Sequence, residues 1–468
     1  MAVRSFTMTC QRSFADLSGD RNPVHIDPLT ARRSLLGGVA VHGVHLLLWA
    51  LDVLAAGREL RGFARLRAQF ERGVLVGEAV DLVWQQDKDR LLGRLTGAAG
   101  TSVRISLTLA ECEASAWRGA NEMDALDCEE HEMPALEKKA GNLPLALPPD
   151  WTLMFPHLAA GFPPAIVAAL LATTRLVGMV SPGLLSIFSS LDLSYEPATP
   201  PGDTLNYEVI RADPRVRLVD MAVQSGGLHG TVSAFLRPKP YAQKAMAEMR
   251  ETVGANEFAG QEAILIGGSR GLGELAAKLL AIGGAQVTIT WRQGEADAQA
   301  VVAEAAALGM HMQAQRFDVA APPLDQPGQS VPYTHLYYFA TPRIPAGWPG
   351  QFNPALFAML LDTYAMGLVR SVNWMAARSV PNACIWYPST VFVEQPDPYF
   401  AEYAAAKACG EALCAQLSVQ MAPLRVVADR LPRLPTDQTQ ALAAVDMADG
   451  VATLLASLRR HAELIREK

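Results

Sequence analysis

The 468-residue sequence lacks the features that mark disulfide-linked, zinc-binding and membrane-spanning proteins. Its six cysteines are scattered and include no Cys-x-x-Cys pair, which argues against a disulfide framework and against a metal site. Its most apolar segments are interrupted by polar residues, such as His42 and Thr173, before they reach the roughly 18 apolar residues of a membrane span. The first residues also carry no apolar signal core. We therefore expect a soluble, cytoplasmic protein that holds no metal and does not enter a membrane.

Positive charge is also scarce in this sequence. The 40 Lys and Arg residues are outnumbered by 47 Asp and Glu residues, for a net charge of -7. Such a balance disfavours nonspecific binding to nucleic acid and leaves room only for local basic patches. Hydrophobic residues make up 50% of the chain, and its length predicts about three domains at roughly 150 residues each. We expect a globular protein whose main partner is not nucleic acid.

Two stretches are candidate connectors between these domains. Residues 111–147 are rich in acidic and small side chains and show no sustained strand alternation. Residues 238–262 are polar and partly helical in pattern. The predicted domains are therefore residues 1–115, 148–238 and 259–468.

The first two predicted domains look like copies of one plan. Residues 67–84 align without gaps with residues 192–209, within the stretch 191–210, at a constant offset of 125 residues. In each copy a long apolar segment of helical length comes before this stretch, and alternating, strand-like runs follow it. The matched pairs are Phe70 and Tyr195, Glu71 and Glu196, Gly77 and Gly202, and Glu78 and Asp203. We predict a duplicated unit in which each copy is a helix and a twisted antiparallel sheet.

The first candidate site lies between Phe14 and Asp27. A glycine precedes Asp20 and an Asn-Pro pair follows it, so Asp20 and His25 are predicted to lie on a kinked loop where side chains can converge on a ligand. A carboxylate and an imidazole at this spacing form a candidate acid/base pair. Gly43 opens the apolar helix, where free backbone N–H groups can receive an oxyanion. The alternative is structural, with Asp20 capping a turn and His25 as a hydrogen-bonded loop histidine.

These residues belong to a longer pattern that includes Leu17 to Asp27, Ala31-Arg32-Arg33 and Val41-His42-Gly43. The pattern closely resembles the signature of the MaoC-like (R)-specific enoyl-thioester hydratases and dehydratases, which have a hot-dog fold, and it covers about residues 5–112. The resemblance implies that Asp20 and His25 are a catalytic dyad that adds or removes water across a C=C bond next to a thioester. It implies that Gly43 is an oxyanion donor.

Two positions depart from this family pattern. Leu51 stands where some members place a Ser, so the oxyanion site is expected to be leaner or differently built. In the second copy, the positions of Asp20 and His25 are taken by Leu145 and Asp150. The second copy therefore resembles a non-catalytic hot-dog repeat, which by analogy would widen the acyl tunnel, and its Asp203 is expected to be a structural turn residue.

The third predicted domain begins with a different pattern. The short apolar run 263–266 is typical of a buried parallel strand, and it leads directly into a glycine-rich turn and an Ala/Leu-rich helix. A strand, a glycine turn and a helix N-terminus together can cradle a phosphate. The alternative is a simple connector between a strand and a helix.

The spacing of these glycines, GxxxGxG, resembles that of the short-chain dehydrogenase/reductases, and Tyr403 and Lys407 supply that family's YxxxK over about residues 259–468. The resemblance implies that Tyr403 passes a proton to a carbonyl and that Lys407 lowers the pKa of Tyr403. It assigns the substrate-orienting hydroxyl to Ser389, with Thr390 as a close substitute. It also implies that Asp318 contacts adenine. The residues expected to hold the rest of the dinucleotide are Gly267, Ser269, Arg270, Gly271, Leu272 and Gly273.

The choice of cofactor can be argued from charge. Sites for NAD present an acid to the ribose 2′-hydroxyl at the end of the second strand, whereas a 2′-phosphate needs a cation. Arg292 stands at that position, so NADP(H) is expected. Two departures lower the expected activity: the family's Asn-Ala-Gly is Ala340-Thr341-Pro342, and the Asn of its proton relay is Tyr364.

The whole sequence thus predicts an α+β double hot-dog followed by an α/β Rossmann domain, that is, a doubly wound parallel sheet. The first hypothesis for its function is a bifunctional 3-ketoacyl-thioester reductase and 3-hydroxyacyl-thioester dehydratase of fatty-acid or polyketide-type biosynthesis. The substrate would be an acyl carrier protein or CoA thioester, and the chain would form a homodimer. Arginines at 58, 61, 65, 67 and 72 are candidates to meet the carrier's phosphates or acidic helix, and the alternative for each is a solvated surface residue. One alternative runs both steps backward in β-oxidation with NAD. Another is an acyl-binding scaffold with one or both sites inactive.

Overall fold

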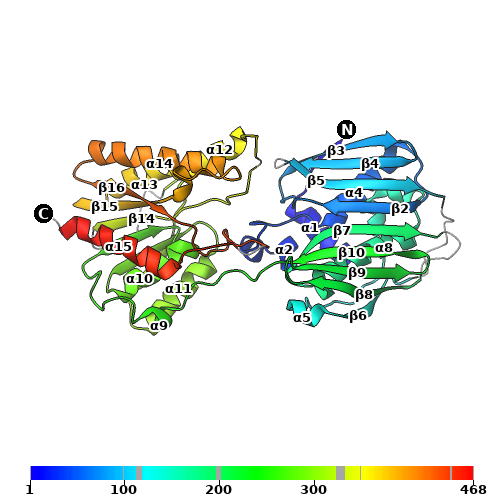
Figure 1. Ribbon diagram of the computed structural model, residues 1–468, viewed down its shortest axis with the longest axis horizontal. Helices are drawn as coiled ribbons and strands as arrows, with labels where there is room; N and C mark the ends of the chain where they lie inside the picture. Colours follow the sequence, from blue (N-terminus) through cyan, green and yellow to red (C-terminus); the bar gives the residue numbers. More distant parts are fainter. Residues whose placement is uncertain are drawn as a thin grey trace. The chain divides into compact units, whose positions relative to one another are not determined.

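The computed structural model describes residues 2–97, 100–111, 119–196, 202–322, 332–347, 349–442 and 445–466. Cys112 and most of the proline-rich segment between Asp318 and Leu336 lie outside these residues. The chain forms two compact units (Figure 1). Unit 1 is Met1–Pro240 with Ala441–Ala444, and unit 2 is Tyr241–Gln440 with Val445–Lys468.

Unit 1 is built on one antiparallel sheet, which has ten strands among the described residues. The central pair is β2 and β7, which meet in antiparallel register with Leu66 opposite Leu193. The strands in spatial order are β1 (Ala2–Ser5), β3 (Ala79–Asp87), β4 (Arg90–Gly97), β5 (Gly100–Leu109), β2 (Phe63–Phe70), β7 (Ser186–Tyr195), β10 (Leu228–Leu236), β9 (Leu218–Ser225), β8 (Thr204–Asp213) and β6 (Ala140–Pro144). Strand β2 belongs to the first half of unit 1 and β7 to the second half. Because the two strands pair with each other, neither exposes unpaired backbone groups between the halves, and this favours one continuous sheet over two.

Two apolar helices lie against one face of this sheet (Figure 1). They are α4 (Gly43–Gly57) and α8 (Pro164–Arg175), and α8 continues into a π-helical turn, η1 (Leu176–Val180). A helix that is apolar around most of its circumference has to be buried, and the side chains of Leu47 and Ile166 are fully buried in one shared core. The shorter helices of the unit are α1 (Met8–Ser18), α2 (Pro23–Ile26), α3 (Pro28–Ala31), α5 (Met133–Leu136), α6 (Trp151–Met154) and α7 (Pro156–Ala159).

The sequence repeat coincides with a repeat in this structure. Strands β2 and β7 end at Phe70 and Tyr195, and β3 and β8 begin at Ala79 and Thr204, each pair 125 residues apart. The two predicted domains 1–115 and 148–238 nevertheless share one sheet and one core, so they form a single compact unit.

Both predicted connectors contain ordered elements. The first contributes α5 and the edge strand β6, which pairs with β8. The second contributes α9 (Met246–Met249), whose Met246 and Met249 are buried in a core of unit 2. These elements are only four or five residues long, too short to give a clear periodic pattern in the sequence.

Unit 2 is built on a parallel sheet with six strands among the residues that the structure describes. Numbered along the unit, the strands lie in the order 3-2-1-4-5-6, which is the doubly wound order of dinucleotide-binding folds. The predicted Rossmann architecture is therefore confirmed. In spatial order the strands are β13 (Met312–Arg316), β12 (Gln286–Trp291), β11 (Glu262–Ile266), β14 (Tyr333–Tyr338), β15 (Ser379–Thr390) and β16 (Arg425–Leu431).

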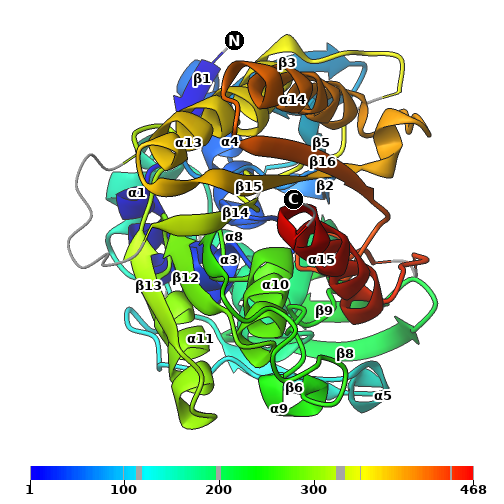
Figure 2. The ribbon, with the colours of Figure 1, turned by 90° about the vertical axis from the view of Figure 1, so that its left-hand side faces the viewer.

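Helices cover both faces of the parallel sheet (Figure 2). One face carries α10 (Gly271–Ile282), α11 (Glu295–Ala307) and α15 (Gly450–Arg466). The other carries α14 (Ala401–Gln420) and the continuous helix formed by α12 (Pro354–Leu361), η2 (Asp362–Gly367) and α13 (Leu368–Ala376). A 3-10 turn, η3 (Val391–Val393), follows β15.

The continuous helix Pro354–Ala376 is the one described helix that is long and apolar enough to cross a membrane, judged by length and composition. Leu360, Leu368 and Val372 on this helix are fully buried in a core of unit 2. Packing against the sheet and α14 therefore accounts for much of its apolar composition.

Candidate active sites

The motif around Asp20 is a pair of helix ends. Gly19 ends α1 with a left-handed φ of 70°, and Asn22 caps α2 by accepting a hydrogen bond from the Val24 amide. Pro23 is the first residue of α2, where its missing N–H costs nothing. Asp20 therefore lies on the short loop between the helices, and His25 lies in the single turn of α2 rather than on the loop itself.

Asp20 is 1% exposed and its carboxylate is held from two sides. Thr174 on α8 donates its hydroxyl to Oδ2 at 2.7 Å, and the Asn22 amide donates to Oδ1 at 3.2 Å. Burial raises the pKa of Asp20, while the nearby His25 and these two hydrogen bonds oppose that rise. The carboxyl group can therefore exchange a proton with a substrate.

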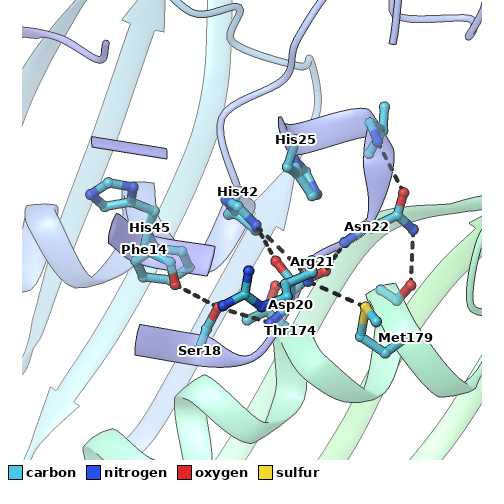
Figure 3. A network of polar contacts seen from close by, with 12 residues as sticks. Phe14, Ser18, Asp20, Arg21, Asn22, His25, His42, His45, Thr174 and Met179 are labelled. Carbon is cyan, nitrogen blue, oxygen red and sulfur yellow. Dashed lines mark hydrogen bonds and ion pairs between the residues drawn. The ribbon is translucent and has the colours of Figure 1, made fainter. Parts of the chain in front are cut away.

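His25 has a defined orientation. Its Nδ1 lies 2.8 Å from the carbonyl oxygen of Ala40, so this nitrogen carries a proton and Nε2 is left for the site. Its ring stacks on that of His42, with centroids 3.8 Å apart (Figure 3). Burial lowers the pKa of His25, and the Asp20 carboxylate opposes that shift. The structure thus brings the predicted dyad together, because polar atoms of Asp20, His25 and His42 lie within 4.8 Å of one another.

His42 is fixed between α1 and the Asp20 loop. Its Nδ1 and its backbone amide both contact Oε1 of Gln11, at 2.9 and 3.2 Å, and its Nε2 lies 3.0 Å from the carbonyl oxygen of Asp20. By residue type, Asp20, His25 and His42 could hold a metal ion. Both ring nitrogens of His42 already contact oxygen atoms, however, so the arrangement favours a hydrogen-bonded acid/base site over a metal site.

Gly43 begins α4, as predicted, and the amides of a first helical turn have no partners within their helix. A Cβ atom at Gly43 would lie 3.0 Å from the Phe70 ring, so close packing of this ring is one reason for the glycine. Leu51, at the departure from the family pattern, is fully buried in the core. In the second half Leu145 is buried and Asp150 is exposed, so these two positions form no second dyad.

Several arginines predicted to meet a carrier are already paired. Arg65 and Arg67 on β2 both donate to the Asp192 carboxylate on β7, at 2.8 and 2.6 Å for the shortest contacts. Arg61 donates to Glu59. Their charges are therefore partly neutralised within unit 1, which weakens the predicted carrier surface.

In unit 2, the glycine turn follows β11 as expected. Gly267 has a φ of +83° and Gly271 a φ of +61°, and a Cβ at Gly273 would lie 2.2 Å from the Gly267 carbonyl oxygen. The turn is fastened to β12, since the amide of Gly267 donates to the Thr290 hydroxyl at 3.0 Å. Only glycines allow this path, and it leads into the N-terminus of α10, so the turn fits a dinucleotide pyrophosphate.

The other predicted cofactor residues lie in this turn and the start of α10, or just after β12 and β13. Ser269 is buried and Leu272 packs against a core of unit 2. Arg270 lies 3.7 Å from the Asp437 carboxylate, so an anionic neighbour competes with any role at a phosphate. Arg292 is exposed just beyond β12. Asp318 follows β13 and accepts a hydrogen bond from the Ala320 amide at 3.0 Å.

Of the two candidate hydroxyls, Thr390 interacts with Tyr403, whereas the preferred candidate, Ser389, is bound elsewhere. Ser389 donates to the Glu411 carboxylate at 2.5 Å, and Glu411 is also bound by Arg430. Thr390 is the group whose side-chain hydrogen bond lowers the pKa of Tyr403. Neighbouring residues of a strand point to opposite faces, so only one of these two hydroxyls can serve Tyr403.

The predicted effect of Lys407 on Tyr403 is wrong for this structure. Burial dominates and raises the pKa of Tyr403 to about 12. Lys407 instead donates to the Pro388 carbonyl oxygen at 2.6 Å, and its ammonium lies over the rings of Tyr364 and Tyr387, 4.2 and 4.5 Å from their centroids. Tyr364 replaces the family's Asn and supplies an aromatic face that attracts this nitrogen when it is charged. Burial lowers the pKa of Lys407 to about 7.

Comparison with known families agrees with the geometry of unit 1, because residues 4–104 match the family model described as MaoC like domain. This segment is a MaoC-like domain. It contains Asp20, His25 and Gly43. The chain thus joins a MaoC-like domain to a Rossmann unit that resembles short-chain dehydrogenase/reductases, as the sequence predicted.

Solved structures similar to this chain include a short chain dehydrogenase from Burkholderia cenocepacia J2315 in complex with NADP, at 23% identity, 43% coverage of this chain, 90% of that chain and a TM-score of 0.38. A dehydrogenase/reductase from Sinorhizobium meliloti 1021 has 21% identity, coverage of 47% and 90%, and a TM-score of 0.36. Acetoin dehydrogenase YohF from Salmonella typhimurium has 16% identity, coverage of 44% and 92%, and a TM-score of 0.37. No curated protein matches the sequence.

Three residues of the dyad's surroundings were not predicted. Gln11 lies in α1 and fixes His42, and Thr174 lies in α8 and holds Asp20. Gly178 in η1 faces Asp20, because a Cβ there would lie 2.1 Å from Oδ1. In the sequence, the one signal for this contact is a polar Thr174 within a long apolar helix, because a buried hydroxyl needs a hydrogen-bond partner.

Proposed function

We propose that the chain is a bifunctional enzyme that reduces a 3-oxoacyl thioester and then dehydrates the 3-hydroxyacyl product to a 2-enoyl thioester. The observation that carries the proposal is the convergence of Asp20 and His25 in a buried site within a MaoC-like domain. Unit 1 as a whole fits a double hot-dog, with one long helix and one set of antiparallel strands in each half. The second half would then complete the site without a dyad of its own.

In the dehydration step, the Asp20 carboxylate removes the proton from C2 of the acyl chain. In the reactive form Asp20 is ionised and His25 is protonated on both ring nitrogens. Nε2 of His25 donates its proton to the hydroxyl at C3, the C3–O bond breaks, and water leaves as the C2=C3 bond forms. The amide of Gly43 stabilises the negative charge that develops on the thioester oxygen. Transfer of the proton from Asp20 to His25 then restores the starting state.

The reduction step would use unit 2. The glycine turn would hold NADPH, which would supply a hydride to the carbonyl carbon. Tyr403 donates a proton to the carbonyl oxygen and Thr390 orients that oxygen. The exposed Arg292 beyond β12 favours NADP(H) over NAD and thereby the reductive direction.

The direct test supplies 3-oxobutanoyl thioesters of CoA and of acyl carrier protein together with NADPH. NADPH consumption followed by enoyl formation supports both activities, and the better thioester identifies the carrier. A clear preference for NAD would favour the reverse pathway of hydration and oxidation. Homodimer formation and cytoplasmic location remain predictions for sizing and localisation experiments.

A second candidate function is a dehydratase or hydratase whose Rossmann unit does not catalyse reduction. It is favoured by the position of Lys407 over the rings of Tyr364 and Tyr387, and by the pKa of Tyr403, which burial raises to about 12. Both features oppose formation of a phenolate. Enoyl formation from a 3-hydroxyacyl thioester, with no NADPH consumption from the 3-oxoacyl thioester, would select this candidate.

A further inference from the structure

We propose that Thr174, in the half of unit 1 that lacks a dyad, is a positioning residue that keeps Asp20 ionised and oriented for dehydration. The inference rests on the proposed dehydratase function of the MaoC-like domain. It gives the second half a direct part in the chemistry, in addition to its role in the shared sheet and core.

The contact between the two residues is short and shielded from water. The Thr174 hydroxyl donates to Oδ2 of Asp20 at 2.7 Å, and the two residues are 2% and 1% exposed. In a buried setting, a hydrogen bond to a carboxylate favours its charged form. Thr174 therefore opposes the rise that burial imposes on the pKa of Asp20.

The neighbouring Thr173 shows that this contact is specific to position 174. Thr173 is also fully buried on α8, but its hydroxyl donates to the carbonyl oxygen of Leu170 on its own helix, at 2.7 Å. Such a bond back to the helix is the usual arrangement for a threonine within a helix. Thr174 instead donates to a carboxylate 154 residues away in the sequence.

The backbone that follows Thr174 holds the other side of the Asp20 loop. The helix widens into η1, and π-helical turns are frequent at functional sites. The carbonyl oxygen of Gly178 in this turn accepts a hydrogen bond from the Asn22 side chain at 2.9 Å, and the Asn22 amide donates to Oδ1 of Asp20. Each carboxylate oxygen is thus tied to the second half, Oδ2 directly and Oδ1 through Asn22 (Figure 3).

The role predicts a change in the pH profile. Without the Thr174 hydroxyl, Asp20 takes up a proton at higher pH and can no longer accept the proton from C2. The acid limb of kcat/KM for dehydration should therefore move to higher pH. At pH values where wild-type Asp20 is ionised, loss of a hydrogen bond to a charged group predicts a roughly 10- to 100-fold decrease.

The experiment measures enoyl formation from a 3-hydroxybutanoyl thioester by the full chain across pH. The variants are Thr174→Val, which keeps the shape, Thr174→Ser, which restores the hydroxyl, and Thr173→Val, the matched control. We expect the acid limb to shift upward in Thr174→Val and to stay near the wild-type position in the other two. Should Thr174→Val fail to fold, Thr174→Ala removes the same hydroxyl with no steric demand and replaces it in the comparison.

The outcomes separate this inference from the proposed function. Wild-type turnover with an unshifted acid limb in Thr174→Val overturns the role of Thr174 alone. An equal shift in Thr173→Val also overturns it, because the effect would then belong to the helix as a whole. A wild-type chain that forms no enoyl product overturns the proposed dehydratase and the inference with it.

Discussion

The imidazole rings of His25 and His42 lie parallel to within 24°, with their centroids 3.8 Å apart. Gln11 fixes His42 through its ring and its backbone amide, and His42 in turn contacts the Asp20 carbonyl oxygen. The dyad is therefore supported by a second histidine whose own mobility is restricted. Because side chains held by packing and hydrogen bonds keep a catalytic geometry, this support suits an acid/base site.

Gly178→Ala should disrupt dehydration by steric contact with Asp20. The new Cβ would lie 2.1 Å from Oδ1, so the carboxylate or η1 must move, at a cost of about 1–3 kcal/mol typical of overpacking. We expect at least a tenfold loss of enoyl formation from the 3-hydroxybutanoyl thioester. Gly57→Ala, where a Cβ meets no atom within 4 Å, is the matched control and should retain wild-type activity. Equal activity of the two variants would contradict the close contact.

Gly273→Ala should prevent dinucleotide binding by unit 2. Its Cβ would lie 2.2 Å from the carbonyl oxygen of Gly267, so the glycine turn cannot keep its path. Calorimetric titration with NADPH should show binding to the wild-type chain and none to the variant. Gly450→Ala, whose nearest contact is an ordinary 3.5 Å, should bind NADPH normally. Normal binding by Gly273→Ala would mean that the cofactor does not use this turn.

Arg292→Asp should reverse the preference between the two dinucleotides. An acid at this position repels a 2′-phosphate and can accept a hydrogen bond from a 2′-hydroxyl. We expect NADPH affinity to fall roughly 10- to 100-fold, by loss of a charge-assisted contact, while NADH affinity rises. Arg250→Asp makes the same charge change at another exposed arginine and should leave the ratio unchanged. A similar ratio in both variants would remove the charge argument for NADP(H).

Lys407 predicts a pH-dependent stability of unit 2. Its pKa in the folded state is about 7, below its ordinary value of 10.5, so folding releases a proton between these two pH values. The free energy of unfolding of wild type, relative to that of Lys407→Met, should therefore increase with pH between about 7 and 10.5, by at most about 1.4 kcal/mol per pH unit. The same contribution is lost as the pH falls from 10.5 to 7. This difference is measured by thermal unfolding at several pH values. The transition of unit 2 is identified as the one whose midpoint temperature rises when NADPH is added. A constant difference across this range would show that Lys407 is not buried as a neutral amine.

Local sequence patterns were enough to locate most elements of both sites. Gly19, Asn22 and Pro23 define the helix ends around Asp20, and the glycine turn follows a buried strand. These features depend on neighbours within a few residues, where backbone conformation follows from residue type. The doubly wound parallel sheet of unit 2 was also predicted, but its strand order comes from the structure.

The remaining features depend on contacts that sequence spacing does not encode. The Thr174 hydroxyl donates a hydrogen bond to Asp20, 154 residues away in the sequence, and the Ser389 hydroxyl donates to Glu411 on α14. Lys407 lies over the rings of Tyr364 and Tyr387. The effect of the substitution at Tyr364 on Lys407 can therefore be seen only in the folded structure, where both rings meet its side-chain nitrogen. The sequence alone therefore could not decide between Ser389 and Thr390 at Tyr403, or identify the partners of Lys407, because tertiary packing determines both.

The most direct test of the two-site account follows the products formed by Asp20→Asn and Tyr403→Phe from a 3-oxobutanoyl thioester and NADPH. The account predicts that Asp20→Asn consumes NADPH and accumulates the 3-hydroxy thioester, whereas Tyr403→Phe consumes no NADPH yet still dehydrates added 3-hydroxy thioester. Loss of both activities in either variant would contradict the existence of two separate sites.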